Sequence, residues 1–443
     1  AAVSEPVDPS GLTVGIVGGG QLARMLALAG YPLGLHFIVL DPAKDACAGQ
    51  VATQLHGEYD DPDALDELAR RCDVVTFDFE NVPAAALEHL AAEVPVAPNP
   101  RALGTAQDRL AEKTLFRELD IPTPVYAAVD SREELSIAVA TTGLPAVLKT
   151  RRFGYDGKGQ RVLRERADLD AAWAELAGHA LILEGFVPFT RELSILAARS
   201  ADGTTVFWPL VENVHTGGIL RLSRAPADAE ALEATARAHA QAVLDALDYV
   251  GVLAIEFFDV GGTLIANEMA PRVHNSGHWT IEGAETSQFE NHLRAVLDLP
   301  LGPTALGAPA AVMANVIADG TIDLDAVDAQ EVTDLASGPV HVHLYGKRSR
   351  SGRKVGHVTA LAEDLPTARR RAEAPGRSLP LVVASHAAVD AAVPVATNGA
   401  STGAPPDASF HPEARPAPAG PGFDDPLARR LAQAGIRLLA IRS

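Results

Sequence analysis

The sequence is poor in cysteine and in positive charge, and it has no long hydrophobic run. Only two of its 443 residues are cysteines, Cys47 and Cys72, which excludes a disulfide scaffold and a cysteine-rich metal site. Such usage is typical of a reducing compartment, so we expect a cytoplasmic protein. Because we find neither a signal segment at the N-terminus nor an apolar run of about 18 residues, we expect no association with a membrane.

Basic residues are outnumbered by acidic ones. The chain has 37 lysine and arginine residues against 57 aspartate and glutamate residues, a formal net charge of -20. This balance argues against a general binder of nucleic acid or of anionic membranes, while it leaves room for a local basic pocket that takes phosphate. With 47% hydrophobic residues, the chain is long enough for two or three domains with substantial cores.

The N-terminal hundred residues predict a small parallel sheet. Apolar runs at residues 12–17, 37–40 and 74–79 are typical of buried strands, and a helical pattern at residues 21–29 separates the first two. Strands that alternate with helices favour a parallel arrangement. The segment is followed by a proline-rich turn at residues 98–100, which we interpret as a domain boundary.

A glycine-rich turn joins the first strand to that helix. Residues 18–20 are all glycine and lead into Gln21, where free backbone N–H groups and the helix dipole favour an anion, so phosphate binding is expected. A G-x-G-x-x-A pattern that starts at Gly18, with Asp41 about 20 residues further on, also fits a dinucleotide fingerprint. A dinucleotide-binding protein is therefore an alternative interpretation of this segment.

A second glycine-rich segment follows a short apolar run. Gly154, Gly157 and Gly159 make a loop whose backbone can approach a ligand closely. Lys149 and Lys158 flank and enter this loop, and both can meet phosphate charge. The combination indicates a site for a nucleoside triphosphate.

Two acidic residues lie on a predicted hairpin downstream. Strand-like segments at residues 252–258 and 263–269 carry Glu256 and Glu268. A three-residue turn would pair the two carboxylates directly, whereas a two-residue turn would place Asn267 opposite Glu256. Facing carboxylates destabilise a sheet unless a divalent cation lies between them, and magnesium is the natural candidate, with manganese as an alternative.

Seven motifs are informative together, at residues 18–25, 154–160, 184–187, 191–194, 256, 267–272 and 273–280. They resemble those of the ATP-grasp ligases, and among these the N5-carboxyaminoimidazole ribonucleotide synthetases of purine biosynthesis. The resemblance implies an α/β and α+β protein, and it implies a homodimer. The expected parts are an N-terminal Rossmann-like (pre-ATP-grasp) domain at 1–100, an ATP-grasp domain at 101–300 and a small C-terminal β-rich domain at 301–365.

The resemblance also assigns roles to individual residues. Those assigned to ATP are Arg109, Lys149, Gly154, Tyr155, Asp156, Gly157, Lys158, Gly159, Gln160, Glu184, Gly185, Phe186, Val187, Glu192, His215, Asn267 and Glu268. The metal ligands are expected to be Glu256 and Glu268. The ribonucleotide is assigned to Gly20, Gln21, Leu22, Glu80, Asn81, Lys347 and Arg353, with Lys354 as a substitute, and the catalytic residues are Arg272, His274, Asn275, Lys158, Tyr155 and Asp156.

The C-terminal part has a different composition. Residues 366–443 are rich in alanine, proline and glycine and lack the large apolar residues that offset the entropy of ordering. A helix is expected to begin at about Thr367 and to stop before Pro375. We expect the tail as a whole to be disordered and assign it no catalytic role.

The reaction that the resemblance implies consumes ATP and bicarbonate. Carboxyphosphate forms first, and the amine of 5-aminoimidazole ribonucleotide is then carboxylated, with release of ADP and phosphate in de novo IMP biosynthesis. The alternative within the superfamily is another carboxylate-amine ligase, such as a formate-dependent glycinamide ribonucleotide enzyme. In either case the partners are small molecules, and neither nucleic acid nor a membrane is expected.

Overall fold

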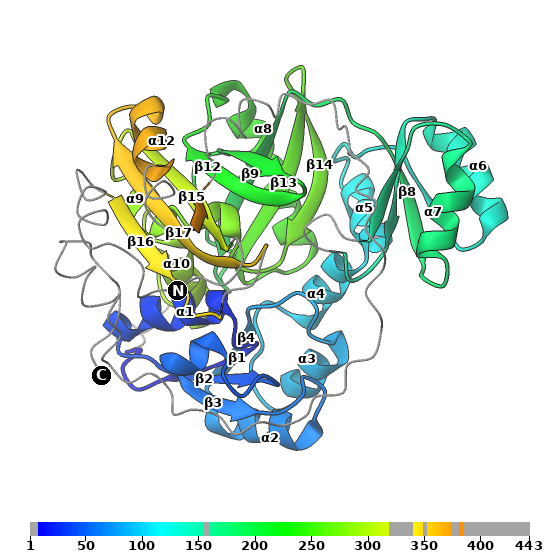
Figure 1. The fold of residues 1–443 in the computed structure, drawn as a ribbon. Coiled ribbons are helices and arrows are strands. Elements are labelled where there is room, and N and C mark those ends of the chain that lie inside the picture. Colours follow the sequence, from blue (N-terminus) through cyan, green and yellow to red (C-terminus); the bar gives the residue numbers. More distant parts are fainter. Residues whose placement is uncertain (1–7, 155–158, 319–339, 349–351, 374–380, 384–443) are drawn as a thin grey trace.

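The computed structural model describes residues 8–154, 159–318, 340–348, 352–373 and 381–383. Within these residues the strands form three sheets (Figure 1). A parallel sheet lies at the bottom of the view in blue, a small antiparallel sheet lies at the right in cyan and teal, and a large sheet occupies the top in green to orange. No helix in the described part is both long and apolar enough to cross a membrane.

The parallel sheet has the order β3-β2-β1-β4. Its strands are β1 (Thr13–Val17), β2 (His36–Asp41), β3 (Thr53–His56) and β4 (Val74–Phe77), and its helices are α1 (Gln21–Gly30), α2 (Pro62–Arg71) and α3 (Ala84–Ala91), with short helices η1 (Tyr31–Leu33) and η2 (Cys47–Gln50). Buried apolar residues on both faces explain the continuous hydrophobic runs in the sequence. The predicted strands are present, except that the last one ends at Phe77 and leaves Phe79 in the following loop.

Two helices connect this sheet to the rest of the molecule. The predicted boundary at residues 98–100 precedes α4 (Pro100–Gln107), and α5 (Arg109–Glu118) follows it at once. Asp108 separates the two because its side chain accepts hydrogen bonds from the first-turn N–H groups of α5. The chain therefore turns between α4 and α5.

The small sheet has the order β5-β8-β6-β7. Its strands are β5 (Tyr126–Val129), β6 (Ala146–Thr150), β7 (Gln160–Leu163) and β8 (Leu181–Gly185), and helices α6 (Arg132–Thr142) and α7 (Asp168–Leu176) pack on it. No strand of the other two sheets pairs with it in the described residues. It therefore forms a separate module with its own hydrophobic cluster, at the right of Figure 1.

The large sheet has ten described strands in the order β14-β13-β9-β11-β12-β15-β17-β16, with β10 on β9 and β18 on β15. The strands are β9 (Arg191–Arg199), β10 (Thr205–Phe207), β11 (Val211–Thr216), β12 (Ile219–Ala225), β13 (Gly251–Val260), β14 (Thr263–Ala270), β15 (Ala310–Ala318), β16 (Val340–Leu344), β17 (Lys354–Ala362) and β18 (Leu381–Val383). The helices are α8 (Glu230–Ala246), η3 (Asn275–Gly277), α9 (Thr280–Gly283), α10 (Gln288–Val296) and α12 (Leu365–Glu373). Because β12 pairs with β15, the C-terminal strands continue the sheet of the central domain.

The C-terminal boundary differs from the prediction. Helix α12 starts at Leu365 and buries Ala368 and Ala372 in the cluster under β15 and β17. Strand β18 lies further on and pairs with β15. The helix expected from about Thr367 is thus present and begins at Leu365, whereas β18 departs from the expectation of a disordered tail. The remaining residues of the tail lie outside the described part.

Candidate active site

The two predicted acidic residues face each other on neighbouring strands. In the hairpin of β13 and β14, Val260 pairs with Thr263 across a two-residue turn of glycines at positive φ, so of the two turns considered from the sequence the shorter one is present. Continued without interruption, this register would place Asn267 opposite Glu256. A β-bulge shifts the register by one residue, and Glu268 becomes the partner of Glu256.

Helix α5 holds the bulge from the open side of β14. Lys113 donates a hydrogen bond through Nζ to the carbonyl of Asn267, and Glu112 accepts one from the backbone N–H of Met269 at 2.6 Å. Buried backbone groups that the bulge removes from the ladder are thus satisfied by side chains. Asn267 contributes its carbonyl to this support, and its side chain does not line the cleft described below.

The facing carboxylates have opposite electrostatic surroundings. Burial raises the pKa of Glu256 to about 7, with Glu268 adding to the shift. Burial acts in the same sense on Glu268, but Arg109, whose guanidinium lies 2.9 Å from its carboxylate, outweighs it and lowers the pKa to about 2. Near neutral pH, Glu268 is ionised and Glu256 is poised to ionise when a cation binds.

The donor set at this position suits a hard divalent cation. Two carboxylates on adjacent strands offer oxygen ligands, which magnesium and manganese prefer. The described residues contain no cluster of three or more histidine, cysteine or acidic side chains that could hold a metal by itself. Phosphate oxygens and water would therefore have to complete the coordination, as is usual for magnesium bound with a nucleotide.

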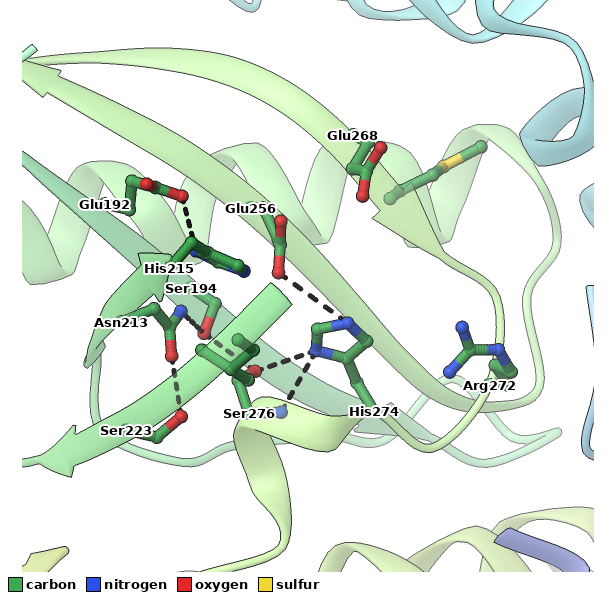
Figure 2. Close-up of polar contacts among 12 residues, drawn as sticks. Glu192, Ser194, Asn213, His215, Ser223, Glu256, Glu268, Arg272, His274 and Ser276 are labelled. Atoms are coloured by element: carbon green, nitrogen blue, oxygen red, sulfur yellow. Dashed lines mark hydrogen bonds and ion pairs between the residues drawn. The ribbon is translucent and has the colours of Figure 1, made fainter. Parts of the chain in front are cut away.

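Two histidines lie beside Glu256 and differ in charge (Figure 2). His274 places Nε2 3.6 Å from Oε1 of Glu256, and burial, reinforced by Arg272, lowers its pKa to about 3. His215 lies 2.7 Å from the carboxylate of Glu192, which outweighs burial and raises the pKa of His215 to about 9. A neutral and a protonated imidazole thus flank the same carboxylate.

Arg272 connects the large sheet to the N-terminal sheet. Its guanidinium forms an ion pair with Glu80, which follows β4, and donates a hydrogen bond to the carbonyl of Val273 at 2.9 Å. Asn275, one turn further on, has both amide atoms buried without a hydrogen-bond partner in the described structure. An unsatisfied buried amide is costly, so this side chain is suited to a polar ligand.

The glycine-rich turn after β1 is held by carboxylates. Asp41 accepts a hydrogen bond from the N–H of Gly19 at 2.7 Å, and Asp78 accepts one from the N–H of Ala23 at 3.1 Å. A side chain at Gly18, which has a φ of 109°, would collide with Asp78. Asp41 is thus engaged in supporting the turn, which is a different use from the ribose contact of a dinucleotide fingerprint.

Two lysines of the C-terminal domain lie at the same cleft. Lys347 donates a hydrogen bond to the side chain of Gln21, and Lys354 lines the same cleft. Arg353 does not line it, and its guanidinium bonds the carbonyl of Arg348 at 2.9 Å. The structure therefore brings the predicted substitute, Lys354, to the cleft and leaves Arg353 outside its lining.

The predicted nucleotide residues on the small sheet have a mixed placement. Lys149 and Glu184 are both largely buried and form an ion pair at 2.8 Å. Glu184 is the one acidic residue of β8, and its partner is a lysine that the sequence analysis assigned to phosphate. Gly154 lines the cleft, whereas Gly159 lies in the turn before β7 and Gln160 begins that strand. Residues 155–158, which include the predicted Tyr155, Asp156, Gly157 and Lys158, lie outside the described part.

One cleft of roughly 620 Å³ joins these elements. The predicted residues that line it are Gly20, Gln21, Leu22, Glu80, Asn81, Arg109, Gly154, His215, Glu256, Glu268, Arg272, His274, Asn275, Lys347 and Lys354. Predicted residues outside its lining are Lys149, Gly159, Gln160, Glu184, Gly185, Phe186, Val187, Glu192, Asn267 and Arg353. Sequence reasoning missed the lining residues Tyr59, Asp78, Phe79, Gln107, Glu112 and Arg151. Of these, Asp78 and Phe79 carried a usable signal, because they lie at the carboxyl end of the run predicted as a strand at residues 74–79.

Comparison with known proteins accounts for this arrangement. Family models match a ribonucleotide synthetase pre-ATP-grasp domain at residues 12–107, an ATP-grasp domain at 114–289 and a phosphoribosylaminoimidazole carboxylase C-terminal domain at 311–371. The N5-carboxyaminoimidazole ribonucleotide synthase of Pseudomonas aeruginosa is 53% identical over 81% of this chain and 97% of its own length. The chain belongs to the N5-carboxyaminoimidazole ribonucleotide synthase family.

Solved structures of the family agree with this assignment. The Thermus thermophilus N5-carboxyaminoimidazole ribonucleotide synthetase superposes with a TM-score of 0.77 at 52% identity and covers 83% of this chain and 98% of its own. The Aspergillus clavatus N5-carboxyaminoimidazole synthase, solved with ADP and 5-aminoimidazole ribonucleotide, gives 0.76 at 31% identity and covers 83% of this chain and 98% of its own. The predicted family and the three-part fold are confirmed.

Membership of the N5-carboxyaminoimidazole ribonucleotide synthase family also defines the class of chemistry. Members carboxylate 5-aminoimidazole ribonucleotide to N5-carboxyaminoimidazole ribonucleotide in purine biosynthesis, and this chain is an ATP-dependent ligase of the ATP-grasp type. ATP binding follows from the fold and from nucleotide complexes of relatives. The prediction of an ATP-dependent carbon-nitrogen ligase is thereby confirmed.

Proposed function

We propose that the cleft binds ATP, bicarbonate and 5-aminoimidazole ribonucleotide together and forms N5-carboxyaminoimidazole ribonucleotide, ADP and phosphate through carboxyphosphate. The observation that carries this proposal is the meeting of the acidic pair with the glycine-rich turn in one cleft. An acidic pair suits metal-bound phosphates, and the turn with its neighbouring lysines suits the phosphate of a ribonucleotide. The close relatives over four fifths of the chain support the same substrates.

The acidic pair defines the nucleotide end of the cleft. Glu256 and Glu268 would hold magnesium, or manganese in its place, which would supply positive charge against the negative charge that develops during phosphoryl transfer. Arg109 is already ion-paired with Glu268 and would turn one or more of its donors to the phosphates when they bind. By resemblance to the family, Lys149 would add positive charge from the small sheet, where it pairs with Glu184.

Residues after β14 lie between the two ends and suit the acyl phosphate. An oxygen of bicarbonate attacks the γ-phosphorus of ATP, the bond to the bridging oxygen breaks, and ADP leaves. The amine then attacks either the carbon of carboxyphosphate or the carbon of CO2 that carboxyphosphate has released. In both cases phosphate and a proton depart. Arg272, His274 and Asn275 would orient the anionic intermediate, since each lines the cleft.

The ribonucleotide end lies against the N-terminal sheet. Gly20, Gln21 and Leu22 at the start of α1, with Lys347 and Lys354, would receive the 5'-phosphate. Glu80 and Asn81 follow β4 at the carboxyl edge of the sheet, where open parallel sheets bind ligands. By resemblance to the family, Tyr155, Asp156 and Lys158 would also contact substrate.

The remaining assignments rest on resemblance to the family and on composition. We propose a homodimer, which sedimentation equilibrium at micromolar concentration would test. We propose a cytoplasmic location, because the two cysteines show no disulfide, with Cys47 buried. Fractionation of cells that express the protein would test this point.

The deciding experiment follows oxygen and carbon from bicarbonate. Purified protein is given Mg-ATP, 5-aminoimidazole ribonucleotide and bicarbonate labelled with 18O and 14C, and each component is omitted in turn. We expect ADP release that needs both substrates, one 18O atom in the phosphate formed, and 14C in the product. ADP release that ignores the ribonucleotide but responds to formate and another amine would replace the substrate assignment, and phosphate without 18O would exclude carboxyphosphate.

A further inference from the structure

A line of buried polar side chains leads away from the cleft behind His274 (Figure 2). Ser223 on β12 donates a hydrogen bond to Oδ1 of Asn213 on β11 at 2.8 Å, and Nδ2 of Asn213 donates to Ser194 on β9 at 2.9 Å. Ser194 donates to Ser276 in η3 at 2.9 Å. Oγ of Ser276 lies 2.8 Å from Nδ1 of His274, so the line is unbroken from β12 to the imidazole.

The chemistry of these groups fixes the direction of the hydrogen bonds. The amide nitrogen of Asn213 can only donate, so Ser194 accepts from it and uses its own proton toward Ser276. Ser276 accepts that bond, and the proton of its hydroxyl is left for His274. The backbone N–H of Ser276, which also can only donate, points to the same Nδ1 at 3.3 Å.

Nδ1 of His274 therefore accepts from two donors and carries no proton itself. An imidazole with a bare Nδ1 is neutral and has its single proton on Nε2. Nε2 is the atom that faces Oε1 of Glu256 across 3.6 Å. The other tautomer would place a lone pair against that carboxylate, and it would leave the N–H of Ser276 without an acceptor.

We propose that Ser276, Ser194, Asn213 and Ser223 form a positioning relay that holds His274 as the Nε2–H tautomer, so that His274 presents a hydrogen-bond donor to the cleft. The four relay residues are almost completely buried, and the described lining of the cleft contains His274 but none of them. They act on the reaction only through His274. The use of this donor in the reaction rests on the function proposed above, whereas the tautomer follows from the hydrogen bonds alone.

The arrangement of the relay favours this role over simple packing. Its residues come from three neighbouring strands and from η3. If their only role were to fill space, apolar side chains of similar size would do so without the cost of burying polar groups that need hydrogen bonds. A neutral donor in this place can bond an anionic oxygen of bicarbonate or carboxyphosphate without adding charge beside Glu256. The sequence contains no short motif for the relay, because its members are spread from residue 194 to residue 276.

The first test reads the tautomer and needs no substrate. In protein labelled with 15N-histidine, two-bond correlation spectra distinguish a protonated Nε2 from a protonated Nδ1, and His274→Gln identifies the signal of His274 by its loss. We expect Nε2–H in the natural protein. Asn213→Asp removes the donor to Ser194 at constant size, so we expect its His274 signal to move toward the Nδ1–H pattern.

Matched controls separate the relay from general damage. Asn291 is another buried asparagine, bonded to Gly302 outside the cleft, and Asn291→Asp should leave the His274 signal unchanged. A natural protein with Nδ1–H, or an Asn213→Asp variant with an unchanged His274 signal, would overturn the proposal. Both outcomes can be read even if the enzyme turns over a different substrate.

The second test separates turnover from binding. Ser276→Ala removes the hydroxyl next to the imidazole, and we expect kcat to fall roughly 10- to 100-fold while KM for ATP stays within about twofold. Thr76→Val breaks a comparable buried hydroxyl–histidine bond, to His292 at 2.8 Å, and should keep kcat. Ser276→Cys retains a weak donor and should recover part of the loss. Equal losses in Ser276→Ala and Thr76→Val, or a rise in KM alone, would contradict a positioning role.

Discussion

The cleft contains two pairs of acidic residues, and the surrounding protein holds them in opposite ways. Asp41 and Asp78, at the N-terminal sheet, accept hydrogen bonds from backbone N–H groups of the glycine-rich turn and of α1. Glu256 and Glu268, on the large sheet, face each other and are surrounded by cationic or histidine side chains. Backbone donors cannot move away from a carboxylate, whereas side chains can, so the first pair shapes the cleft and the second pair can exchange its partners for a ligand.

The largest expected effect of this contrast is on turnover. Glu268→Gln removes the ionised member of the exchangeable pair, and we expect kcat to fall at least about 100-fold, since a metal site supplies several kcal/mol of transition-state stabilisation. ADP release under saturating substrates measures this loss. The melting temperature should change little, because Glu268 supports no backbone group in the described structure. Near-normal turnover would remove Glu268 from the metal site.

Asp41→Ala should give the reverse pattern. Asp41 accepts from the N–H groups of Gly19 and Ala43 and from the hydroxyl of Tyr59, and loss of a buried acceptor costs about 1–3 kcal/mol. We expect a lower free energy of unfolding in urea and a higher KM for the ribonucleotide, with kcat largely kept. A variant as stable as the natural protein would contradict the supporting role of this carboxylate.

The pH dependence of stability sharpens the comparison at Asp78. Burial raises its pKa to about 6 despite the bond from Ala23, so between about pH 4 and 6 the folded state binds more protons than the unfolded state, and stability falls as pH rises. Asp78→Asn keeps an oxygen acceptor without the charge. We therefore expect the free energy of unfolding of the variant, minus that of the natural protein, to rise by about 2 kcal/mol as the pH rises from 4 to 7.5. Urea titrations at the two pH values would measure this difference. A difference independent of pH would refute this origin.

The smallest effect concerns a single hydroxyl. Tyr59 donates to Asp41 at 2.9 Å, and Asp41 keeps its two backbone donors when this bond is lost. Tyr59→Phe should therefore lower the free energy of unfolding by only about 1 kcal/mol and leave kcat unchanged. A loss of stability as large as that of Asp41→Ala would mean that the hydroxyl of Tyr59, and not the backbone N–H groups, holds the Asp41 carboxylate in place.

The sequence predicted the acidic hairpin but not how the carboxylates come to face each other. Periodicity located both strands, while the β-bulge depends on Lys113 and Glu112, which lie more than 150 residues away from the strand they support. Nothing local in the sequence of β14 indicates such a shift. From the sequence, the facing pair required the three-residue turn, whereas in the structure the two-residue turn is present and the bulge supported by α5 makes Glu256 and Glu268 partners.

Other parts of the site show the same limit. The glycine-rich turn was predictable because glycine at positive φ is a local requirement. The pairing of Lys149 with Glu184 required the order of strands in the small sheet, where β6 and β8 are neighbours. Asp41 was noticed only for its spacing, and its use as an acceptor for the turn appears once the fold brings β2 beside β1.

The pairing of β12 with β15 has a consequence for the synthesis of the protein. β12 ends at Ala225 and its partner starts at Ala310, and at ribosomal speeds of about 5–20 residues per second the intervening chain takes roughly 4–17 s to make. Throughout that time β12 has an open edge that another strand could occupy. The continuous sheet that joins the central and C-terminal domains in the finished enzyme is thus a place where a nascent chain is exposed to wrong partners.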